Sequence, residues 1–312
     1  MFGFVVVLIA AGFFCIQNVI VRILFVPQNL FGVFPTGGVV EPTLYNSFLL
    51  MAMRMVVVVP LMAGLSSALY QPMWKDVQRL SDRAMGRSLV HAIGSGGLMF
   101  LYLALLYFAI GLIPTGIALT LFFTYPCFTA VLGWWLWGAR PSTFRWLIMA
   151  GILIGTALTV PFGDLQTSNI AWGAGISLGL TAGLAQALYT VNAQKGMEQI
   201  HPMPFTWVTF AVALGISALC VGLWPVQDAP PLSWTPLWIG GVASAVVTFA
   251  GHLLNNYGIR QIGATPAAMI GASNPTLTVI LAWIAIQEMP SVVQLCGVLL
   301  VTLCVVALSW VR

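Results

Sequence analysis

Charged residues are scarce in this sequence, and their scarcity excludes a water-soluble protein. Of the 312 residues only 6% are charged, whereas 60% are hydrophobic, and the mean hydropathy is +0.99. A soluble domain carries roughly a quarter charged residues. Long apolar runs recur along the chain, and no stretch remains for a soluble catalytic domain. The composition therefore predicts an all-α integral membrane protein.

Acidic residues are the scarcest of all at membrane depth. None of the seven Asp and Glu residues lies inside an apolar run. An intramembrane enzyme would need an acid, a base and a nucleophile close together, so we expect no enzymatic activity. Proton and sodium carriers usually depend on an intramembrane carboxylate. The sequence therefore favours facilitated exit or exchange over a carboxylate-driven pump.

Cysteine and histidine patterns give no sign of a metal or a cofactor. The five cysteines all fall inside apolar runs, and their spacing fits neither a metal site nor a disulfide framework. We expect them to be small buried hydrophobic residues.

The net charge of +4 does not indicate nucleic acid binding, because the basic residues sort by membrane side. The first apolar run is longer than a signal-peptide core, so we expect it to be retained as a span.

Ten apolar runs are long enough to cross a bilayer, which needs about 20 residues per helix. The expected spans are Phe4–Phe25, Tyr45–Leu65, Leu89–Leu112, Thr115–Trp137, Phe144–Pro161, Ile170–Ala193, Phe205–Leu223, Leu237–Gly258, Thr265–Ile286 and Val292–Val311. With a cytoplasmic N-terminus, the inner side receives Lys75, Arg79, Arg83, Arg87, Arg140, Arg145, Lys195, Arg260 and Arg312. The outer connections receive no basic residue. This positive-inside pattern predicts that both termini are cytoplasmic and that the protein lies in a bacterial inner membrane.

The two halves of the chain resemble each other. Shifting the sequence by 149 residues (275 − 126) places Pro126, Trp134 and Pro141 on Pro275, Trp283 and Pro290. We therefore expect two five-helix repeats, residues 1–161 and 170–312. Because five is odd, the second repeat enters the membrane in the opposite orientation. Inverted repeats of this kind are typical of secondary transporters.

Polar side chains at membrane depth are costly, so they usually face the bundle interior or a wet cavity. From those in the expected spans we select candidate substrate-binding residues, which are Asn18, Arg54, Tyr102, Thr124, Gln186, Tyr189, His252, Asn255 and Asn274. The fifth, seventh and tenth spans have almost no polar residues. We expect these three spans to face lipid or to act as scaffold.

Pro126 and Pro275 lie near the middle of their spans. Each removes a backbone donor and leaves the carbonyl four residues earlier, at Phe122 or Gly271, without its helical partner. Matching midplane helix breaks point to a binding site. A kink that serves packing is the alternative for either proline alone.

Two of the candidate residues are ionisable. Arg54 has no intramembrane carboxylate to pair with, so its partner is a freed carbonyl, an Asn or Tyr side chain, or the carboxylate of a substrate. His252 shares a helix face with Asn255 and Asn256. It is the histidine at depth that could titrate near neutral pH, although a hydrogen-bonded packing role is the commoner case.

Two connections and one glycine pair carry further expectations. The proline-rich Val26–Leu44 connection is long enough to be an outer lid, or else a poorly ordered surface loop. The Gln71–Arg87 connection has an apolar stripe and regularly spaced basic residues, which predict a short helix on the cytoplasmic leaflet. Gly151 and Gly155 allow close helix approach. We expect packing within one chain, with a homodimer seam as the alternative.

These features together resemble the drug/metabolite transporter superfamily in its ten-helix EamA form. The resemblance rests on Asn18 and Arg22, on Arg54, and on the two proline-centred spans. It is more specific in the second half, in Tyr257-Gly258, in Ile262-Gly263-Ala264, and from Ala267 to Pro275, Glu288 and Gly297. The sequence departs from the family where Gly138-Ala139-Arg140 replaces a Gly-Glu turn and where the Val26–Leu44 connection is longer than usual.

The resemblance implies export or exchange of a small metabolite, often an amino acid, by alternating access. It also implies a central cavity walled by the first, third, fourth, sixth, eighth and ninth spans. A carrier of phosphorylated sugars or nucleotides is an alternative, but such a carrier would need several basic residues at depth. A non-transporting scaffold or sensor is a second alternative, and it would not need matched helix breaks. The expected partners are a small-molecule substrate and the lipid bilayer.

Overall fold

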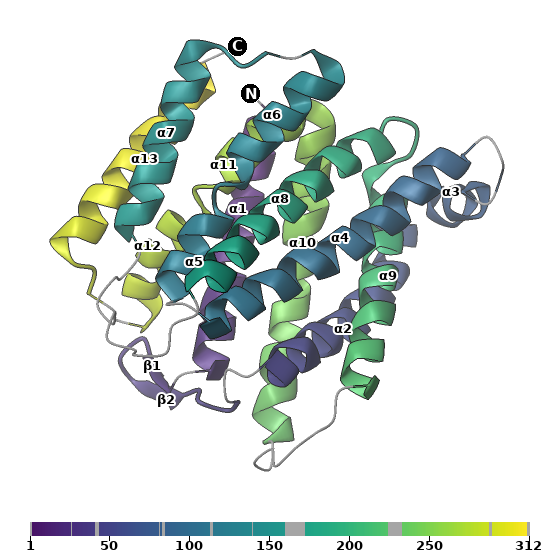
Figure 1. The fold of residues 1–312 in the computed structure, drawn as a ribbon. Coiled ribbons are helices and arrows are strands. Elements are labelled where there is room, and N and C mark those ends of the chain that lie inside the picture. Colours follow the sequence, from purple (N-terminus) through teal and green to yellow (C-terminus); the bar gives the residue numbers. More distant parts are fainter. Residues whose placement is uncertain are drawn as a thin grey trace.

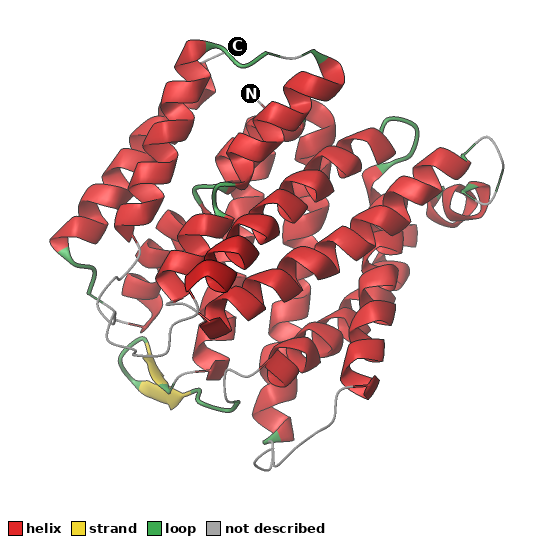
Figure 2. Cartoon of the chain, in the orientation of Figure 1, coloured by secondary structure: helices red, strands yellow, loops and turns green. Residues whose placement is uncertain are grey.

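The fold was analysed in a computed structural model that describes residues 2–25, 27–40, 44–80, 82, 85–112, 115–138, 140–159, 172–223, 233–286 and 289–310. Within these residues the chain forms helices and one small β-hairpin (Figures 1 and 2). The helices are α1 (Phe2–Phe25), α2 (Leu44–Leu69), α3 (Met73–Arg79), α4 (Gly86–Leu112), α5 (Thr115–Phe122), α6 (Tyr125–Trp137), α7 (Thr143–Thr159), α8 (Trp172–Gly196), α9 (Pro202–Leu223), α10 (Trp234–Ile262), α11 (Ala264–Gly271), α12 (Asn274–Ile286) and α13 (Val292–Trp310). The strands are β1 (Gln28–Leu30) and β2 (Phe34–Thr36).

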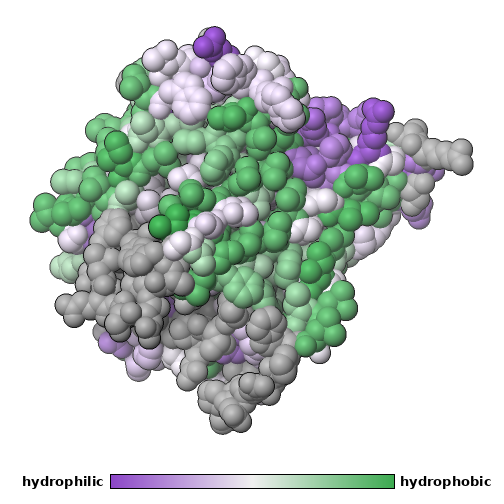
Figure 3. All heavy atoms as spheres, viewed as in Figure 1, coloured by the Kyte–Doolittle hydropathy of each residue, from purple (hydrophilic) through white to green (hydrophobic). Residues whose placement is uncertain are grey.

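The apolar helices confirm the all-α membrane class. Among the described residues, eight helical segments are long and apolar enough to cross a membrane, and α7 and α13 are shorter apolar helices. Two of the eight segments each consist of two helices separated by a short interruption. One segment contains α5 and α6, and the other contains α11 and α12. Apolar residues cover much of the face in Figure 3, while hydrophilic residues gather toward the edge that carries α3. The expected span ends at Pro161, Ile170 and Val311 lie outside the described residues, as does Glu288.

The two interrupted segments have the same dimensions. Helices α5 and α11 each contain 8 residues, and α6 and α12 each contain 13. Helix α11 begins 149 residues after α5 (264 − 115), and α12 begins 149 residues after α6 (274 − 125). The proline follows the first residue of α6 and of α12. Proline is tolerated there because the first helical turn has no intrahelical partner for its N–H groups.

The connection after α1 forms an ordered hairpin instead of a loose loop. β1 pairs antiparallel with β2, and Gly37 and Gly38 follow with positive φ. The N–H groups of Gly38, Val39 and Val40 donate to the carbonyls of Ile23 and Leu24 at the end of α1. The N–H of Phe31 donates to the Ala285 carbonyl near the end of α12, at 2.7 Å. The hairpin therefore satisfies carbonyls that two helix ends would otherwise leave free.

Glycines set how closely several helix pairs approach. A Cβ added at Gly151 would lie 2.5 Å from the Cys304 sulfur, and one at Gly155 would lie 2.6 Å from Val301 Cγ2. Both glycines thus face α13 within the chain, as their small-residue spacing predicts. Helices α1 and α10 approach in the same way, because Gly258 lies against Val7 and Gly3 against Ile262.

The close contact between α1 and α10 predicts the effect of Gly258→Ala. An added Cβ would lie 2.1 Å from Val7 Cγ2, and Val7 is 1% exposed. We expect a loss of about 1–3 kcal/mol of stability from overpacking, measured as a lower melting temperature of the purified protein. Val7→Ala should restore most of the loss in the double variant. Gly12→Ala is the control, because an added Cβ there meets nothing within 4 Å. An unchanged melting temperature for Gly258→Ala would contradict the packing described here.

Candidate functional site

The two helix breaks meet inside the bundle. The first break, at Phe123 and Thr124, separates α5 from α6, and the second, at Ala272 and Ser273, separates α11 from α12. Tyr125, the first residue of α6, is buried with its hydroxyl directed at Gly271, where an added Cβ would lie only 2.5 Å from the phenol oxygen. Segments 149 residues apart in the chain are therefore in contact at their breaks.

Hydroxyl side chains supply hydrogen bonds at both breaks. Thr124 Oγ1 donates to the Leu121 carbonyl at 2.6 Å, and Ser273 Oγ donates to the Ile270 carbonyl, also at 2.6 Å. Helix α8 lies close to the broken backbone, because Gly183 packs directly against the carbonyl oxygen of Phe122. Backbone irregularity at membrane depth is tolerated only where protein or a wet cavity surrounds it, and these contacts meet that condition.

Five residues on four helices form a buried polar group, here called the central cluster. It comprises Arg54 of α2, Tyr102 of α4, Tyr189 of α8, and His252 and Asn256 of α10, each less than a tenth exposed. The rings of Tyr102 and Tyr189 lie 6.1 Å apart, and the Tyr189 hydroxyl donates to Asn256 Oδ1 at 3.4 Å. Helix α2, which carries Arg54, packs against α4 and α10, which carry Tyr102 and His252.

Aromatic rings enclose this cluster and connect it to the first break. Phe14 and Phe210 contact the His252 imidazole edge-on, at centroid distances of 4.8 and 5.4 Å. Phe122, the last residue of α5, stacks on Tyr102 at 5.9 Å and lies 5.8 Å from Tyr125. The central cluster and the two breaks are therefore parts of one continuous region.

Several buried polar atoms in this part of the protein have no hydrogen-bond partner within the described chain. They include Arg54 Nε, Gln186 Oε1 and His252 Nδ1. An unsatisfied polar atom in a buried position costs about 1–3 kcal/mol. Such a cost is usual at a functional site, where a ligand supplies the partner.

A second polar contact joins α1 to α12. The amide nitrogen of Asn18 donates to Asn274 Oδ1 at 3.0 Å and to Thr278 Oγ1 at 3.2 Å. The thiol of Cys15, one turn earlier, lies 3.4 Å from the same Asn274 oxygen. Asn18 is exposed and Asn274 is partly exposed, so this contact borders accessible space.

The structure brings most of the sequence-predicted residues into these two groups. Arg54, Tyr102, Tyr189 and His252 are in the central cluster, Asn18 and Asn274 are in the α1–α12 contact, and Thr124 is at the first break. Gln186 lies one turn before Tyr189 on α8. No hydrogen bond to Asn255 is found among the described residues. Its neighbour Asn256 is the residue that bonds to Tyr189 in the central cluster.

Sequence reasoning missed four contributors. Asn256 was available from its i, i+4 spacing to His252. Tyr125 and Thr278 carry no signal beyond their nearness to a break. Thr206 accepts a hydrogen bond from the Asn256 amide at 2.9 Å and lies on α9, the span that we expected to face lipid or serve as scaffold. A threonine hydroxyl is easily overlooked in an apolar run, and a buried Thr206 is compatible with the scaffold role expected of this span.

The donor set of the described residues does not suit a metal ion, since no three His, Cys, Asp or Glu side chains come together in that part of the chain. The region instead offers guanidinium, phenol, amide and imidazole groups. Groups of these kinds form hydrogen bonds with polar ligands.

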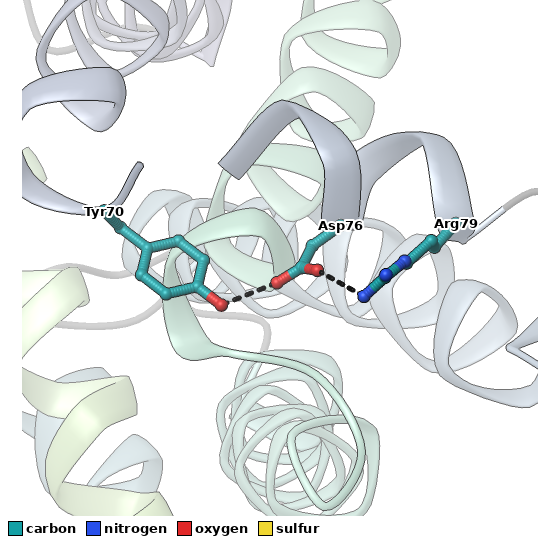
Figure 4. A network of polar contacts seen from close by, with 3 residues as sticks. All are labelled: Tyr70, Asp76 and Arg79. Carbon is teal, nitrogen blue, oxygen red and sulfur yellow. Dashed lines mark hydrogen bonds and ion pairs between the residues drawn. The ribbon is translucent and has the colours of Figure 1, made fainter. Parts of the chain in front are cut away.

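A separate polar network lies outside the membrane-spanning helices, around α3. The Tyr70 hydroxyl donates to Asp76 Oδ2 at 2.7 Å, and Arg79 lies 3.6 Å from the other carboxylate oxygen (Figure 4). His201 stacks on the Tyr70 ring at 3.9 Å. The hydrogen bond to Asp76 raises the pKa of Tyr70. Burial lowers the pKa of His201, and the nearby positive charge of Arg260 lowers it further, although the negative charge of Asp76 opposes this shift. The short helix predicted in the Gln71–Arg87 connection is present as α3 and is shorter than the connection, in which Ser81, Arg83 and Ala84 lie outside the described residues.

The fold and the site define an integral membrane protein with the internal architecture of a transporter. The chain belongs to the EamA-like transporter family, within the drug/metabolite transporter superfamily. The sequence profile of that family matches residues 173–310.

Comparisons with individual proteins agree with this assignment. The chain is 49% identical over 311 residues to the uncharacterized transporter sll1319 of Synechocystis sp., a match that covers 99% of this chain and 93% of that protein. It is 25% identical over 220 residues to the threonine/homoserine exporter RhtA of Salmonella typhimurium, covering 70% of this chain and 67% of the exporter. A solved crystal structure shares the fold with a TM-score of 0.73 at 17% identity, covering 99% of this chain and 95% of that one.

The meeting of the two breaks predicts the effect of Gly271→Ala. The new methyl group would collide with the Tyr125 hydroxyl, and Tyr125 is packed against Phe122 and Phe123. We expect a loss of about 1–3 kcal/mol of stability, measured by thermal unfolding. Adding Tyr125→Phe removes the colliding oxygen and leaves the ring carbon Cζ 3.8 Å from the new methyl carbon. The double variant should therefore recover stability. A double variant no more stable than Gly271→Ala would contradict this arrangement.

The lowered pKa of His201 predicts how stability depends on pH. Because its folded-state pKa lies below the ordinary value of 6.5, the unfolded chain binds the proton first as pH falls. The stability contributed by neutral His201 is present above pH 6.5 and is lost as pH decreases. His201→Phe keeps a ring against Tyr70 but cannot titrate. Between about pH 8 and pH 5.5, the melting temperature of the wild type should fall further than that of His201→Phe, and equal falls would count against the prediction.

Proposed function

We propose that this protein is a secondary transporter that exports or exchanges a small polar or amphipathic metabolite, such as an amino acid, by alternating access. In this proposal ten helices cross the bacterial inner membrane as two inverted five-helix repeats, residues 1–161 and 170–312, and both termini are cytoplasmic. The observation that carries the proposal is the pair of matched helix breaks that contact each other beside the central cluster. Helices interrupted at the midplane, in corresponding positions of two halves, are typical of transporter binding sites.

The distribution of basic residues supports the proposed orientation. Both labelled termini lie at one edge of the bundle in Figure 1, and the hairpin lies at the opposite edge. Lys75 and Arg79 on α3, Arg140 before α7, and Lys195 at the end of α8 all lie outside the apolar spans or at their ends. Basic connections stay preferentially in the cytoplasm. The hairpin connection, which carries no Lys or Arg, would then face outward.

The contact between α1 and α12 supports a change between two states. It joins one proposed repeat to the other through the Asn18 hydrogen bonds to Asn274 and Thr278. Hydrogen bonds between membrane helices contribute only about 0.6 kcal/mol each on average. Breaking these hydrogen bonds therefore costs little free energy. A small cost is needed if the protein is to interconvert between two states that differ by a few kcal/mol.

The hairpin is suited to serve as a lid. Three backbone hydrogen bonds attach it to the end of α1, whereas one, from Phe31, joins it to α12. Among the described residues, a hairpin that moved with α1 would release α12 by losing that hydrogen bond and the packing of Leu30 against Ala282 and Ala285.

The substrate class follows from the site and from one relative. The central cluster offers one guanidinium and several hydrogen-bonding groups, which suit a small polar metabolite better than a multiply charged phosphate ester. The relative RhtA is named as an exporter of threonine and homoserine. We extend amino-acid transport to this chain as part of the proposal.

A reversible cross-link between α1 and α12 tests alternating access with one substitution. Asn274→Cys places a thiol near native Cys15, whose sulfur lies 3.4 Å from the Asn274 side-chain oxygen. After reconstitution in liposomes, the reduced variant should exchange labelled L-threonine faster than empty liposomes do. Oxidation should abolish this exchange and a reductant should restore it, because a disulfide holds the two repeats in one state.

The matched control is the Cys15→Ala, Asn274→Cys double variant, which cannot form this disulfide and should keep its flux after oxidation. Undiminished flux in fully cross-linked protein would refute movement between α1 and α12. Wild-type liposomes that carry no amino acid or other small polar metabolite would refute the transport function itself.

A further inference from the structure

Arg54 is a buried positive charge without a counter-charge. It lies near the middle of α2, which runs from Leu44 to Leu69, and it is 5% exposed. No Asp or Glu of the sequence falls within any of the apolar helices that form the bundle. A charged side chain at membrane depth is expensive unless it is paired or hydrated. The position therefore calls for a partner that the helices do not supply.

The structure also leaves part of the Arg54 guanidinium without a partner among the residues it describes. Its Nε has no hydrogen-bond partner within the described part of the chain. The carbonyls near the first break are approached instead by Thr124 and Gly183. Asn256 is occupied by Tyr189 and Thr206. Neither the freed carbonyls nor this amide neutralises the guanidinium.

A second buried polar group without a partner in the described chain lies on a helix next to that of Arg54. Helix α2 packs against α4 and α10, which carry Tyr102 and His252, and His252 Nδ1 is also buried without a hydrogen-bond partner among the described residues. The imidazole is confined between Phe14 and Phe210, so it cannot easily turn toward water. The Arg54 guanidinium and this imidazole nitrogen are thus two buried polar groups, on helices that pack together, that both lack a hydrogen-bond partner in the described chain.

We propose that Arg54 binds the carboxylate of the transported substrate, so that the central cluster selects carboxylic acids, such as amino acids, over the corresponding amides, which lack the carboxylate charge. This inference rests on the proposed transport function. A carboxylate matches the planar fork of a guanidinium with two parallel hydrogen bonds. It also carries a single negative charge, equal and opposite to that of Arg54. A phosphate dianion would leave excess negative charge in a region of low dielectric, where it is costly.

The test compares ligands that differ only in the carboxylate. Purified full-length protein is titrated with L-threonine, L-homoserine, L-threoninamide and inorganic phosphate, and the apparent Kd is obtained from the ligand-dependent rise in melting temperature. L-threonine should bind at least about tenfold more tightly than L-threoninamide, the size expected for a lost hydrogen bond to a charged group. Phosphate should give no rise. A rise with phosphate equal to that with threonine would mean a general anion site and would overturn the assignment.

Variants of Arg54 locate the preference on this side chain. Arg54→Gln should bind threonine and threoninamide equally, whereas Arg54→Lys, which keeps the charge but loses the fork, should keep a reduced preference for the acid. Arg79→Gln is the matched control, because it makes the same chemical change on an exposed side chain of α3 and should behave as the wild type. If Arg54→Gln does not fold, the wild type and Arg54→Lys still decide the result.

Two outcomes separate this inference from the transport function. Equal affinity for the acid and the amide in the wild type, or an unchanged preference in Arg54→Gln, would overturn the carboxylate site even if flux is measured. No response to any common amino acid or to homoserine would overturn it too. Flux of neutral polar compounds in liposomes would in that case leave transport standing with a different substrate class.

Discussion

The absence of water inside a bilayer is the constraint on which this structure depends. Every backbone carbonyl and polar side chain at membrane depth must find a partner in the protein or in a ligand. Pro126 and Pro275 remove two of the backbone donors. The fold responds by bringing the two breaks together, with Thr124 and Ser273 bonding the nearby carbonyls and Tyr125 placed over Gly271. Polar atoms that still lack a partner are concentrated beside these breaks, and this concentration makes the region a candidate binding site.

Close packing and weak polar contacts have different roles in the bundle. Helix pairs such as α1 with α10 and α7 with α13 approach through glycines against branched or sulfur-containing side chains, which makes them resist small displacements. The contact between α1 and α12 combines hydrogen bonds of Asn18 to Asn274 and Thr278 with the packing of Val19 against Ala282 and Ala285. A transporter needs both kinds of contact, because rigid units must move against each other at an interface that opens easily. The hairpin after α1 adds a single backbone bond to that interface from outside.

Much of the architecture could be predicted because its signals are strong and local. Apolar run lengths and the scarcity of charge predicted the all-α membrane class, and the structure confirms it. The EamA resemblance is confirmed by the family match. The location of α3 followed from its basic and apolar periodicity. The candidate site residues stay predictions, although the structure brings Arg54, Tyr102, Tyr189 and His252 together. Asn255 stays a prediction as well, and the hydrogen bonds to Tyr189 and Thr206 are made by its neighbour Asn256.

The sequence by itself determined the membrane class, the family and the equal spacing of the two breaks, because these depend on composition and on order along the chain. Only the tertiary structure decided that the breaks touch at Tyr125 and Gly271, that Thr206 of an apparently apolar helix joins the polar region, and that Arg54 lacks a partner within the described chain. Contacts of this kind join residues far apart in the chain. They depend on how each helix is rotated against its neighbours, and helix rotation is set by side-chain packing that no local pattern in the sequence records.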